Sequence, residues 1–562
     1  MASLLPHTGI LGTRLAKHLL RRASYHVSKA RIETFSAYTV DQALSELGTI
    51  PAKYLVQPIH YVHLSGNLPG PKPWINDDPL YGAVDTDNGS GTSLLRNYVS
   101  SWWLDEARRD TSYRSKMTYF LFTNFTAGNK VLNGILGAYY DYLQLTEFFC
   151  LGDWKEYVFQ VSKNIIMLDY LNNRLNTKEN PNENYARELL ELFTIGKGAP
   201  AGEGDYTNYT EQDVVEAAKV LTGWRITWAN NRGQYRTGAA YGNIPCGFAS
   251  PYKHDFGQKT FSSRFGNYVI PAWSTAGKTT AESQQRMEDE LKEMIDLILS
   301  QDETAKFVCR KMYRYFVGRN ITAEIENDII VPLAQTFRAN YNLEEPLVEL
   351  LKSKHFYDLD DTNATDNIVG GMIKSPLDLV LQTLNSINFP VPDPISNGLN
   401  HYKKFYYWLV NLGIMDTAGQ NIFDPPSVAG FPPTYESPDF DKFWFNSSTI
   451  VTRYGMADAL LNPNKTMVDF KVSTFVATTV SQPQDAEVLV SELVGLFFPE
   501  AITQDRLSYF VDIVLLDDGS LTTAMWTDAW ITYANTGNAT NIEPPLDDLF
   551  RALLWSQEYQ SN

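Results

Sequence analysis

The stretch PNENYARELLELFTIGKG, residues 181–198, places polar side chains at helical spacing within an otherwise apolar segment. At about 100° per residue, a helix would bring four of them into one sector about 100° wide: Asn184, Arg187, Glu188 and Glu191. Leucine, alanine and aromatic residues fill the opposite side. This wide apolar arc predicts a mostly buried helix, whose polar stripe must face water, a cavity or other polar groups.

The same helical spacing recurs in most of the chain, so the sequence predicts an all-α fold. Thr210 with Asp213 forms a capping-box pattern, and Ser375 followed by proline is a typical helix start. Apolar residues recur three and four positions apart in the segments 12–25, 39–48, 184–195, 210–223, 281–300, 303–317 and 375–387.

Strand-like segments are few, and GNYVIPAW (266–273) is the best candidate. We therefore expect a large multi-helix assembly with long irregular loops and at most a short β-hairpin. A main helical domain is predicted over residues 1–455, with a C-terminal helical lobe over 456–562 packed on it. The predicted loops at 55–94, 224–280 and 388–448 carry many aromatic residues, prolines and glycines, and loops of this length are often functional.

Composition excludes several classes of protein. The chain has 562 residues with 47 basic and 65 acidic side chains, a net charge of −18. Such a surface repels nucleic acid and anionic membranes. No apolar run reaches about 18 residues, so no transmembrane helix is expected. Three cysteines without CxxC spacing argue against a disulfide framework and a zinc knuckle. Cys309, in a helical apolar segment, is predicted to be a small buried hydrophobe.

The polar stripe supports two interpretations. Two carboxylates one turn apart beside an arginine can have different pKa values, so Glu188 or Glu191 could act as a base, with Arg187 orienting charge and Asn184 binding a hydroxyl. The same pair could bind a hard metal ion through oxygen. Alternatively, Arg187 and Glu191 form an ordinary intrahelical ion pair within a network that joins helices.

A second candidate segment is HDFGQKTF, beginning at His254. His254 could carry protons near neutral pH and complete a site with the glutamates, with Asp255 and Lys259 binding substrate. The alternative is a loop whose His–Asp pair caps backbone groups. His60 and His63 have no neighbouring carboxylate, so a structural role is expected for them. The sequence contains no GxSxG elbow, P-loop or HExxH motif, and it specifies neither a metal nor a cofactor.

Two acidic segments resemble calcium loops, DTDNGSG (85–91) and DLDDTNATDN (358–367). Neither keeps the spacing of oxygen ligands that ends in a bidentate glutamate. We expect both segments to be solvated turns.

Long segments of the chain resemble the bacterial domain-of-unknown-function 1800 family. The resemblance rests on MLDYLNNRLNTKENPNENYARELLELFTIGKG with the following YTEQDVVEAAKVLTGWRI, and on blocks in the same order elsewhere. These blocks are HLLRRASYHV, HDFGQKTFSSRFG, TAKFVCRKMYRYFV, IKSPLDLVLQTL, PPSVAGFPP with FWFNSSTIVTR, and LLWSQEYQ. The resemblance implies a shared helical fold but no established reaction. Where relatives have a histidine–asparagine–histidine run, this chain has Phe122, Thr123 and Asn124.

The resemblance also bears on location and partners. The basic residues from Arg14 to Arg31 resemble a mitochondrial presequence. The alternative is a basic amphipathic first helix of the domain, and the family resemblance favours it because it makes these residues part of the family domain. No signal peptide is apparent, which predicts a cytoplasmic protein, with export alongside a partner as the alternative. Relatives are often exported and encoded beside the sulfatase-like domain-of-unknown-function 1501 family.

Two functions therefore remain open. The first is an acid/base enzyme acting on a hydroxyl-rich or anionic, glycan-like substrate. The second is a helical binding or assembly partner of a sulfatase-like or cell-surface export protein. In the second case the aromatic loops would form the interface.

Overall fold

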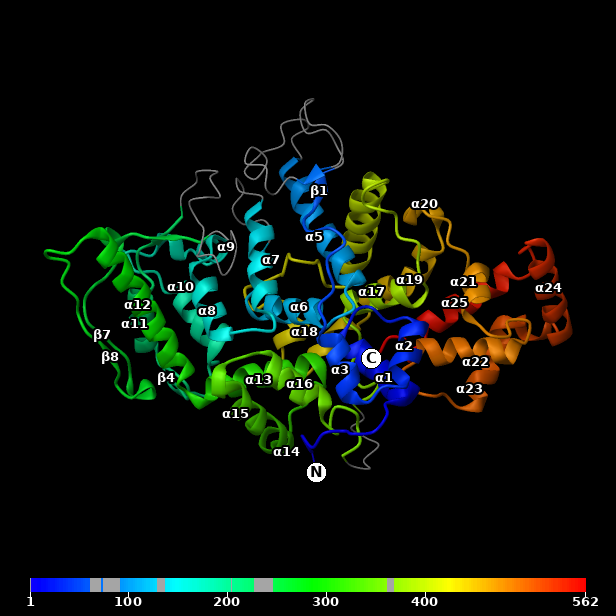
Figure 1. Cartoon of the computed structure of the whole chain (residues 1–562), viewed down its shortest axis with the longest axis horizontal. Helices are drawn as coiled ribbons and strands as arrows, with labels where there is room; N and C mark the ends of the chain where they lie inside the picture. The colour runs from blue at the N-terminus through cyan, green and yellow to red at the C-terminus, as the bar shows by residue number, and fades with distance from the viewer. Residues whose placement is uncertain are drawn as a thin grey trace.

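A computed structural model describes residues 2–60, 72–73, 91–128, 137–203, 205–226, 246–360 and 368–562, and it confirms the all-α class. The molecule is elongated in Figure 1, with α11 and α12 near one end and α24 near the other. Within the described residues, no helix is both long and apolar enough to cross a membrane.

The helices of the first half of the chain are α1 (Gly12–Ala23), α2 (Lys29–Ser36), α3 (Val40–Gly48), α5 (Gly91–Arg109), α6 (Arg114–Asn124), α7 (Gly137–Phe149), α8 (Trp154–Lys163), α9 (Ile165–Tyr170), α10 (Asn184–Glu188), α11 (Glu211–Val220) and α12 (Thr280–Leu299). The next are α13 (Asp302–Phe316), α14 (Ala323–Ile325), α15 (Val331–Asn340), α16 (Glu344–Lys352), α17 (Pro376–Ser386) and α18 (Pro432–Tyr435). The last are α19 (Thr449–Leu460), α20 (Pro463–Thr466), α21 (Val472–Thr479), α22 (Ala486–Phe497), α23 (Gln504–Ser508), α24 (Thr523–Thr536) and α25 (Glu543–Trp555).

Wider π-helical segments extend or replace several helices: η2 (Leu189–Thr194), η7 (Glu326–Ile330), η8 (Leu399–Asp416) and η10 (Tyr509–Leu515). Short 3-10 turns are η1 (Asn173–Leu175), η5 (Pro251–Lys253), η6 (Ser263–Phe265), η9 (Phe440–Trp444) and η11 (Asp517–Gly519).

The strands are short and pair as antiparallel ladders. These are β1 (Ile59–His60) with β2 (Lys72–Pro73), β3 (Pro200–Gly202) with β4 (Asp205–Tyr206), β5 (Trp224–Arg225) with β6 (Phe248–Ala249), and β7 (Lys259–Thr260) with β8 (Val269–Ile270). The strand predicted within 266–273 is β8, and it forms half of a hairpin.

Local sequence signals explain where several helices begin and end. Asp213 accepts a hydrogen bond from the backbone N–H of Thr210 at 2.8 Å, as the capping-box pattern predicts. Ser375 Oγ accepts from the backbone N–H of Asp378 at 3.1 Å at the start of α17. Gly223 follows α11 with a φ of +83°, and a Cβ atom there would lie 2.8 Å from the Ser250 carbonyl oxygen. A glycine is therefore required at this turn.

Helix α1 is buried and binds the C-terminal part of the fold. Lys17 Nζ donates to the Gly495 carbonyl at 2.8 Å, and Arg21 Nη2 donates to the Phe497 carbonyl at 2.7 Å. Buried apolar side chains from Leu11 to Tyr559 form one hydrophobic core, which includes Cys309 as predicted. The boundary predicted after residue 455 falls within α19, and the division into two lobes stays a prediction.

Candidate functional site

The polar helix changes its geometry in the middle of the predicted stripe. α10 continues into η2, so the hydrogen-bonding pattern widens from Leu189 onward. In a π-helix the bonds join residues five apart, and each turn holds about one more residue than in an α-helix. Glu191 is therefore rotated away from the line of Arg187 and Glu188. The single stripe predicted from regular helical spacing is divided.

Arg187 forms ion pairs with two glutamates near the protein surface. Its Nη1 and Nη2 donate to the two carboxylate oxygens of Glu211 at 2.6 and 2.7 Å, and Nη2 also reaches Glu183 at 3.2 Å. The intrahelical pair predicted with Glu191 does not form in the described structure, because the partners of Arg187 lie toward α11 and the helix start. Asn184 begins α10, and its backbone N–H donates to Asn182 Oδ1 at 3.0 Å.

The two glutamates have different surroundings. Glu188 is half-buried, and burial, followed by repulsion from Glu191, raises its pKa. Glu191 accepts hydrogen bonds from Lys197 Nζ at 3.2 Å and from the Tyr209 hydroxyl at 3.1 Å. Of the four stripe residues, only Glu191 lines the large cavity described next.

A cavity of about 420 Å³ lies where α1, α6, η2, α13, α17 and the segment 428–444 meet. We call it the central cavity. The helices that line it occupy the middle of the view in Figure 1. Five of the sequence blocks that resemble the family contribute side chains to its wall, among them Arg22, Glu191, Lys311, Asp378 and Val428. Segments far apart in the sequence thus converge here.

Two cations of α13 line the central cavity without an acidic partner among the described residues. Arg314 makes no hydrogen bond or ion pair with the described part of the chain, its Nε is buried, and its guanidinium carbon lies 4.7 Å from the centre of the Phe440 ring. Lys311 Nζ donates to the Leu192 carbonyl at 2.5 Å and lies 4.5 Å from the centre of the Phe307 ring. Burial, together with the nearby Arg314, lowers the pKa of Lys311 to about 7.

Most of the other charged side chains around the cavity are paired with a charge of opposite sign, whereas Arg22 donates to the backbone carbonyl of Ile368 at 2.9 Å. Lys116 pairs with Asp378, which also accepts from Ser375 Oγ at 2.8 Å. Arg319 donates to both oxygens of Asp441 at 2.5 and 2.7 Å. The cavity therefore carries positive charge that its own acids do not balance, in a chain whose net charge is −18.

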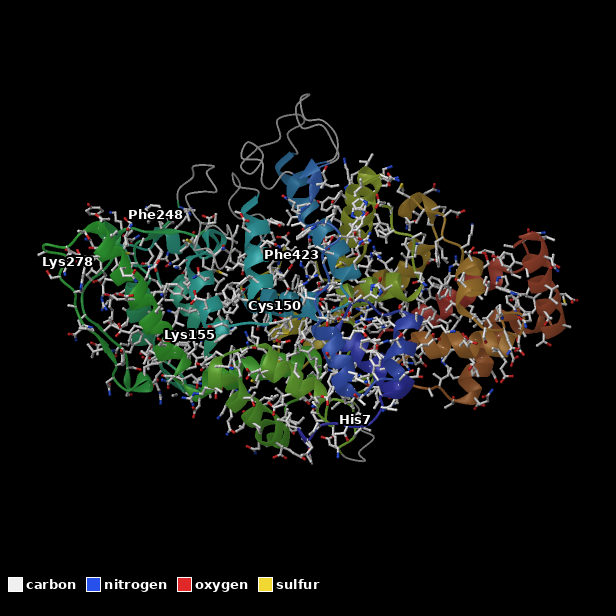
Figure 2. All side chains as sticks on the ribbon, in the orientation of Figure 1. His7, Cys150, Lys155, Phe248, Lys278 and Phe423 are labelled. Carbon is white, nitrogen blue, oxygen red and sulfur yellow. The ribbon has the colours of Figure 1, made fainter. Side chains whose placement is uncertain are left out.

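Of the two positions at which the resemblance places family histidines, 122 and 124, only 124 lines this cavity. Thr123 and Asn124 line it, and both donate to the Phe120 carbonyl, at 2.8 and 2.7 Å. Phe122 points instead into the core, with its ring centre 5.0 Å from that of Phe423, which is labelled near the middle of Figure 2. An imidazole at position 124 would face the cavity, where this chain presents the amide of Asn124, whereas one at position 122 would enter the core.

His254 and Lys259 lie in a different place. Both contact Glu290, which is fully buried on α12: His254 Nε2 is 3.2 Å from Glu290 Oε2, and Lys259 Nζ donates to the same oxygen. Arg286 Nε donates to Glu290 Oε1 at 2.9 Å. We call these four residues the Glu290 cluster. Burial acts to raise the pKa of Glu290, but His254 and Lys259 outweigh it and the pKa is lowered.

The loop around His254 therefore does not join the glutamates in one cavity. None of its residues lines the central cavity. Helix α11 contacts both α10, which carries Glu188, and β7, which contains Lys259. Asp255 Oδ1 accepts from the backbone N–H of Gly257 at 2.7 Å, as in the backbone-capping alternative. The convergence that an enzyme built from Glu188, Glu191 and His254 requires is absent from the described structure.

Sequence reasoning missed Glu290, Lys311 and Arg314. Glu290 sits in a strongly helical segment rich in acids, where nothing marks it as buried. Lys311 and Arg314 form an i, i+3 cationic pair within TAKFVCRKMYRYFV, a segment interpreted above only through its apolar spacing, its cysteine and its resemblance to the family. Two charged residues at this spacing share one helix face, which was the available signal.

Some sequence predictions fall outside the described residues: His63, the segment 85–90, the segment 361–367 and the side chain of His60. Within the described ranges, no three histidine, cysteine, aspartate or glutamate side chains are grouped to hold a metal ion.

Comparison with known proteins gives one match. Neither the curated proteins nor the solved structures contain a similar chain at a significant level. The family model described as "Protein of unknown function (DUF1800)" matches residues 18–561, nearly the whole length, and the chain belongs to this family.

Proposed function

We propose that this protein is an acid/base enzyme that binds a small anionic substrate in the central cavity. The observation that carries the proposal is the unpaired Arg314 beside Lys311. The Arg314 side chain is half-buried, and its buried Nε has no acceptor among the described residues. A buried polar atom without a partner is costly, and native proteins rarely keep one unless a ligand, ion or water completes it. The volume of the cavity, about 420 Å³, suits a small molecule.

Arg314 is the anchor for the anionic group. A guanidinium offers a planar set of donors that matches a carboxylate, phosphate or sulfate. Lys311 adds a second cation one turn earlier on the same helix. The surrounding rings of Phe307 and Phe440 exclude water and strengthen the attraction between these cations and an anion.

Glu191 is the proton acceptor in this proposal. It is held at the cavity wall by Lys197 and Tyr209, so its carboxylate is oriented before substrate arrives. Glu188 does not line the cavity, and in this proposal it acts only through the electrostatic repulsion between its carboxylate and that of Glu191. Arg187 and His254 have no role in this site, because their partners are Glu211 and Glu290.

The first test is a search for anions that bind. Thermal unfolding is followed with a panel of small carboxylates, sugar phosphates and sugar sulfates, and each stabilising compound is titrated by calorimetry. Arg314→Gln should weaken binding by tenfold or more, about 1.4 kcal/mol. Arg310→Gln is the matched control: Arg310 lies on the same helix but pairs with Glu303 and Glu326 and does not line the cavity. A panel without any binder, or equal losses in both variants, would contradict the proposal.

The second test addresses proton transfer. Each bound anion is incubated with the protein in D2O, and exchange of its carbon-bound hydrogens is followed by proton NMR. Glu191→Gln should still bind the anion but slow the exchange by about a hundredfold. Exchange at the wild-type rate in this variant would remove Glu191 from the mechanism while leaving the anion site in place.

A further inference from the structure

Three lysines line the central cavity, and they differ in their partners. Lys116 pairs with Asp378, and Lys197 pairs with Glu191. Lys311 has no carboxylate partner among the described residues, and its one hydrogen-bond acceptor is the neutral Leu192 carbonyl. Lys311 is therefore the cavity amine whose positive charge is least stabilised.

The surroundings of Lys311 favour its neutral form for two reasons. Nζ lies over the Phe307 ring, 4.5 Å from its centre, so water does not solvate the ammonium freely. Arg314 follows on the same face of α13, and its charge repels a second cation. An amine that is neutral near pH 7 is a nucleophile, and burial beside another cation is one of the ways in which proteins produce one.

The spacing of Lys311 and Arg314 also limits the substrate. Residues three apart on a helix have Cβ atoms about 5–6 Å apart. A compound whose carboxylate is held by Arg314 places a neighbouring carbonyl carbon within reach of the flexible Lys311 side chain. The geometry thus suits a small molecule that carries both an anionic group and an aldehyde or ketone.

We infer that Lys311 is an amine nucleophile that forms an imine with the carbonyl group of an anionic substrate. This inference rests on the anion site proposed above. The neutral amine attacks the carbonyl carbon and a C–N bond forms. The carbonyl oxygen then leaves as water, carrying one amine proton and one proton from solvent, and a protonated imine remains. Glu191, which lines the same cavity next to the Leu192 carbonyl that Lys311 contacts, is the group that can then accept a proton from the carbon next to the imine.

The test traps the imine with a defined probe. The full-length wild-type protein is incubated with glyoxylate, which carries a carboxylate and an aldehyde, and is reduced with sodium borohydride at pH 7. Peptide mapping by mass spectrometry should place the carboxymethyl group at Lys311. Labelling of Lys311 should exceed that of Lys306, on the same helix outside the cavity, by about tenfold or more, since an ordinary lysine is almost fully protonated at this pH.

Three comparisons isolate the cause of the labelling. Glycolaldehyde, a neutral aldehyde of similar size, should label Lys311 far less than glyoxylate does. Arg314→Gln should remove this preference for the anion. Lys311→Arg keeps the positive charge and should abolish labelling at residue 311 while retaining anion binding. Circular dichroism and thermal unfolding establish that each variant is folded, and the wild-type map decides the question if one is not.

The outcomes distinguish the two proposals. Selective labelling of Lys311 by glyoxylate supports the inference. Anion binding that depends on Arg314, without labelling of Lys311, overturns the imine and leaves the anion site. Labelling spread evenly over surface lysines, with no anion bound in the calorimeter, overturns both.

Discussion

The Glu290 cluster contains buried charges, whereas Lys311 and Arg314 in the wall of the central cavity are half-buried, and the two sets differ in how they are paired. In the cluster, two cationic side chains and the imidazole of His254 surround one carboxylate, and both oxygens of that carboxylate have partners within the protein. In the cavity, Arg314 has no acceptor in the described part of the chain, and the one acceptor of Lys311 there is a backbone carbonyl. The positive charges of the cluster are paired with a carboxylate, whereas those of Lys311 and Arg314 are not paired with any carboxylate of the described residues.

This difference separates a structural role from a binding role. A closed set of charges fixes the loop around β7 to α12 and offers nothing to a ligand. An incomplete set has a free energy cost that a bound anion can remove. Residue type alone does not distinguish them, because both regions contain lysine, arginine and glutamate in helical segments.

The largest expected effect is on stability, in Glu290→Gln. Removing the carboxylate leaves Lys259 and Arg286 facing a neutral group in a buried site, and we expect a loss of about 3–5 kcal/mol in the free energy of unfolding. Urea denaturation at pH 7 measures it. Asp289→Asn, at an exposed neighbouring position on α12, is the control and should change stability by less than about 0.5 kcal/mol. Similar values for the two variants would mean that the cluster does not brace the fold.

The Glu290 cluster also predicts a pH dependence. The pKa of Glu290 is lowered in the folded state, so its contribution to stability is fully present above the unfolded-state pKa, near 4.5, and is lost as the pH falls through the folded-state pKa. The stability difference between wild type and Glu290→Gln should therefore shrink below about pH 4.5. A difference that stays constant down to pH 3 would contradict this assignment.

The second effect concerns anion binding and the pH. Lys311 has a pKa of about 7 in the free protein, so its charge is present below that pH and lost above it. The affinity for an anion that stays fully ionised, such as a sugar sulfate, should fall by about tenfold as the pH rises from 6 to 8.5. Calorimetric titration measures it. Lys311→Arg keeps its charge throughout this range and should bind with little pH dependence.

A smaller effect separates two arginines of the same helix. Arg310→Gln breaks hydrogen bonds to Glu303 and Glu326 and should cost about 1–2 kcal/mol. Arg314→Gln removes a charge without a partner among the described residues, so the apo protein should keep its stability or gain slightly. Thermal unfolding without added anions compares them. An equal loss in both would show that the fold, rather than a ligand, requires Arg314.

The smallest effect is expected at the polar stripe itself. Arg187 and Glu211 are each about one-third exposed, with side-chain accessibilities of 32% and 39%. Exposed pairs contribute little, so Arg187→Gln should cost about 1 kcal/mol or less and leave anion binding unchanged. A loss of anion binding in this variant would show that Arg187 contributes to the anion site, and the polar stripe and the central cavity could then not be treated as separate.

Much of the fold could be predicted from local sequence. Apolar spacing indicated α12 and α13 to within one residue at each end, because amphipathic helices at this length leave a clear pattern. The caps at Thr210 and Ser375 depend on contacts three residues apart, which are also visible in sequence.

The candidate site was only partly predictable. Glu191 was identified, but the π-helical turn at Leu189 breaks the regular angular spacing on which the stripe was based. Lys311 and Arg314 were identified because neither has an acidic partner among the described residues. Whether a charged side chain has such a partner depends on the folded structure and cannot be recognised from a sequence motif. His254 looked like a proton carrier because its true partner, Glu290, lies 36 residues away.

The wall of the central cavity includes Arg22 from α1 and Trp444 from η9. Contacts between segments so distant in sequence form slowly, because the chain loses the conformational entropy of loop closure before the packing contacts can stabilise it. During synthesis, most of the chain must therefore be made before α1 can pack against the other segments that line the cavity. The anion site should appear only at the end of folding, and an anion that binds there would act as a ligand for the finished protein and not for its intermediates.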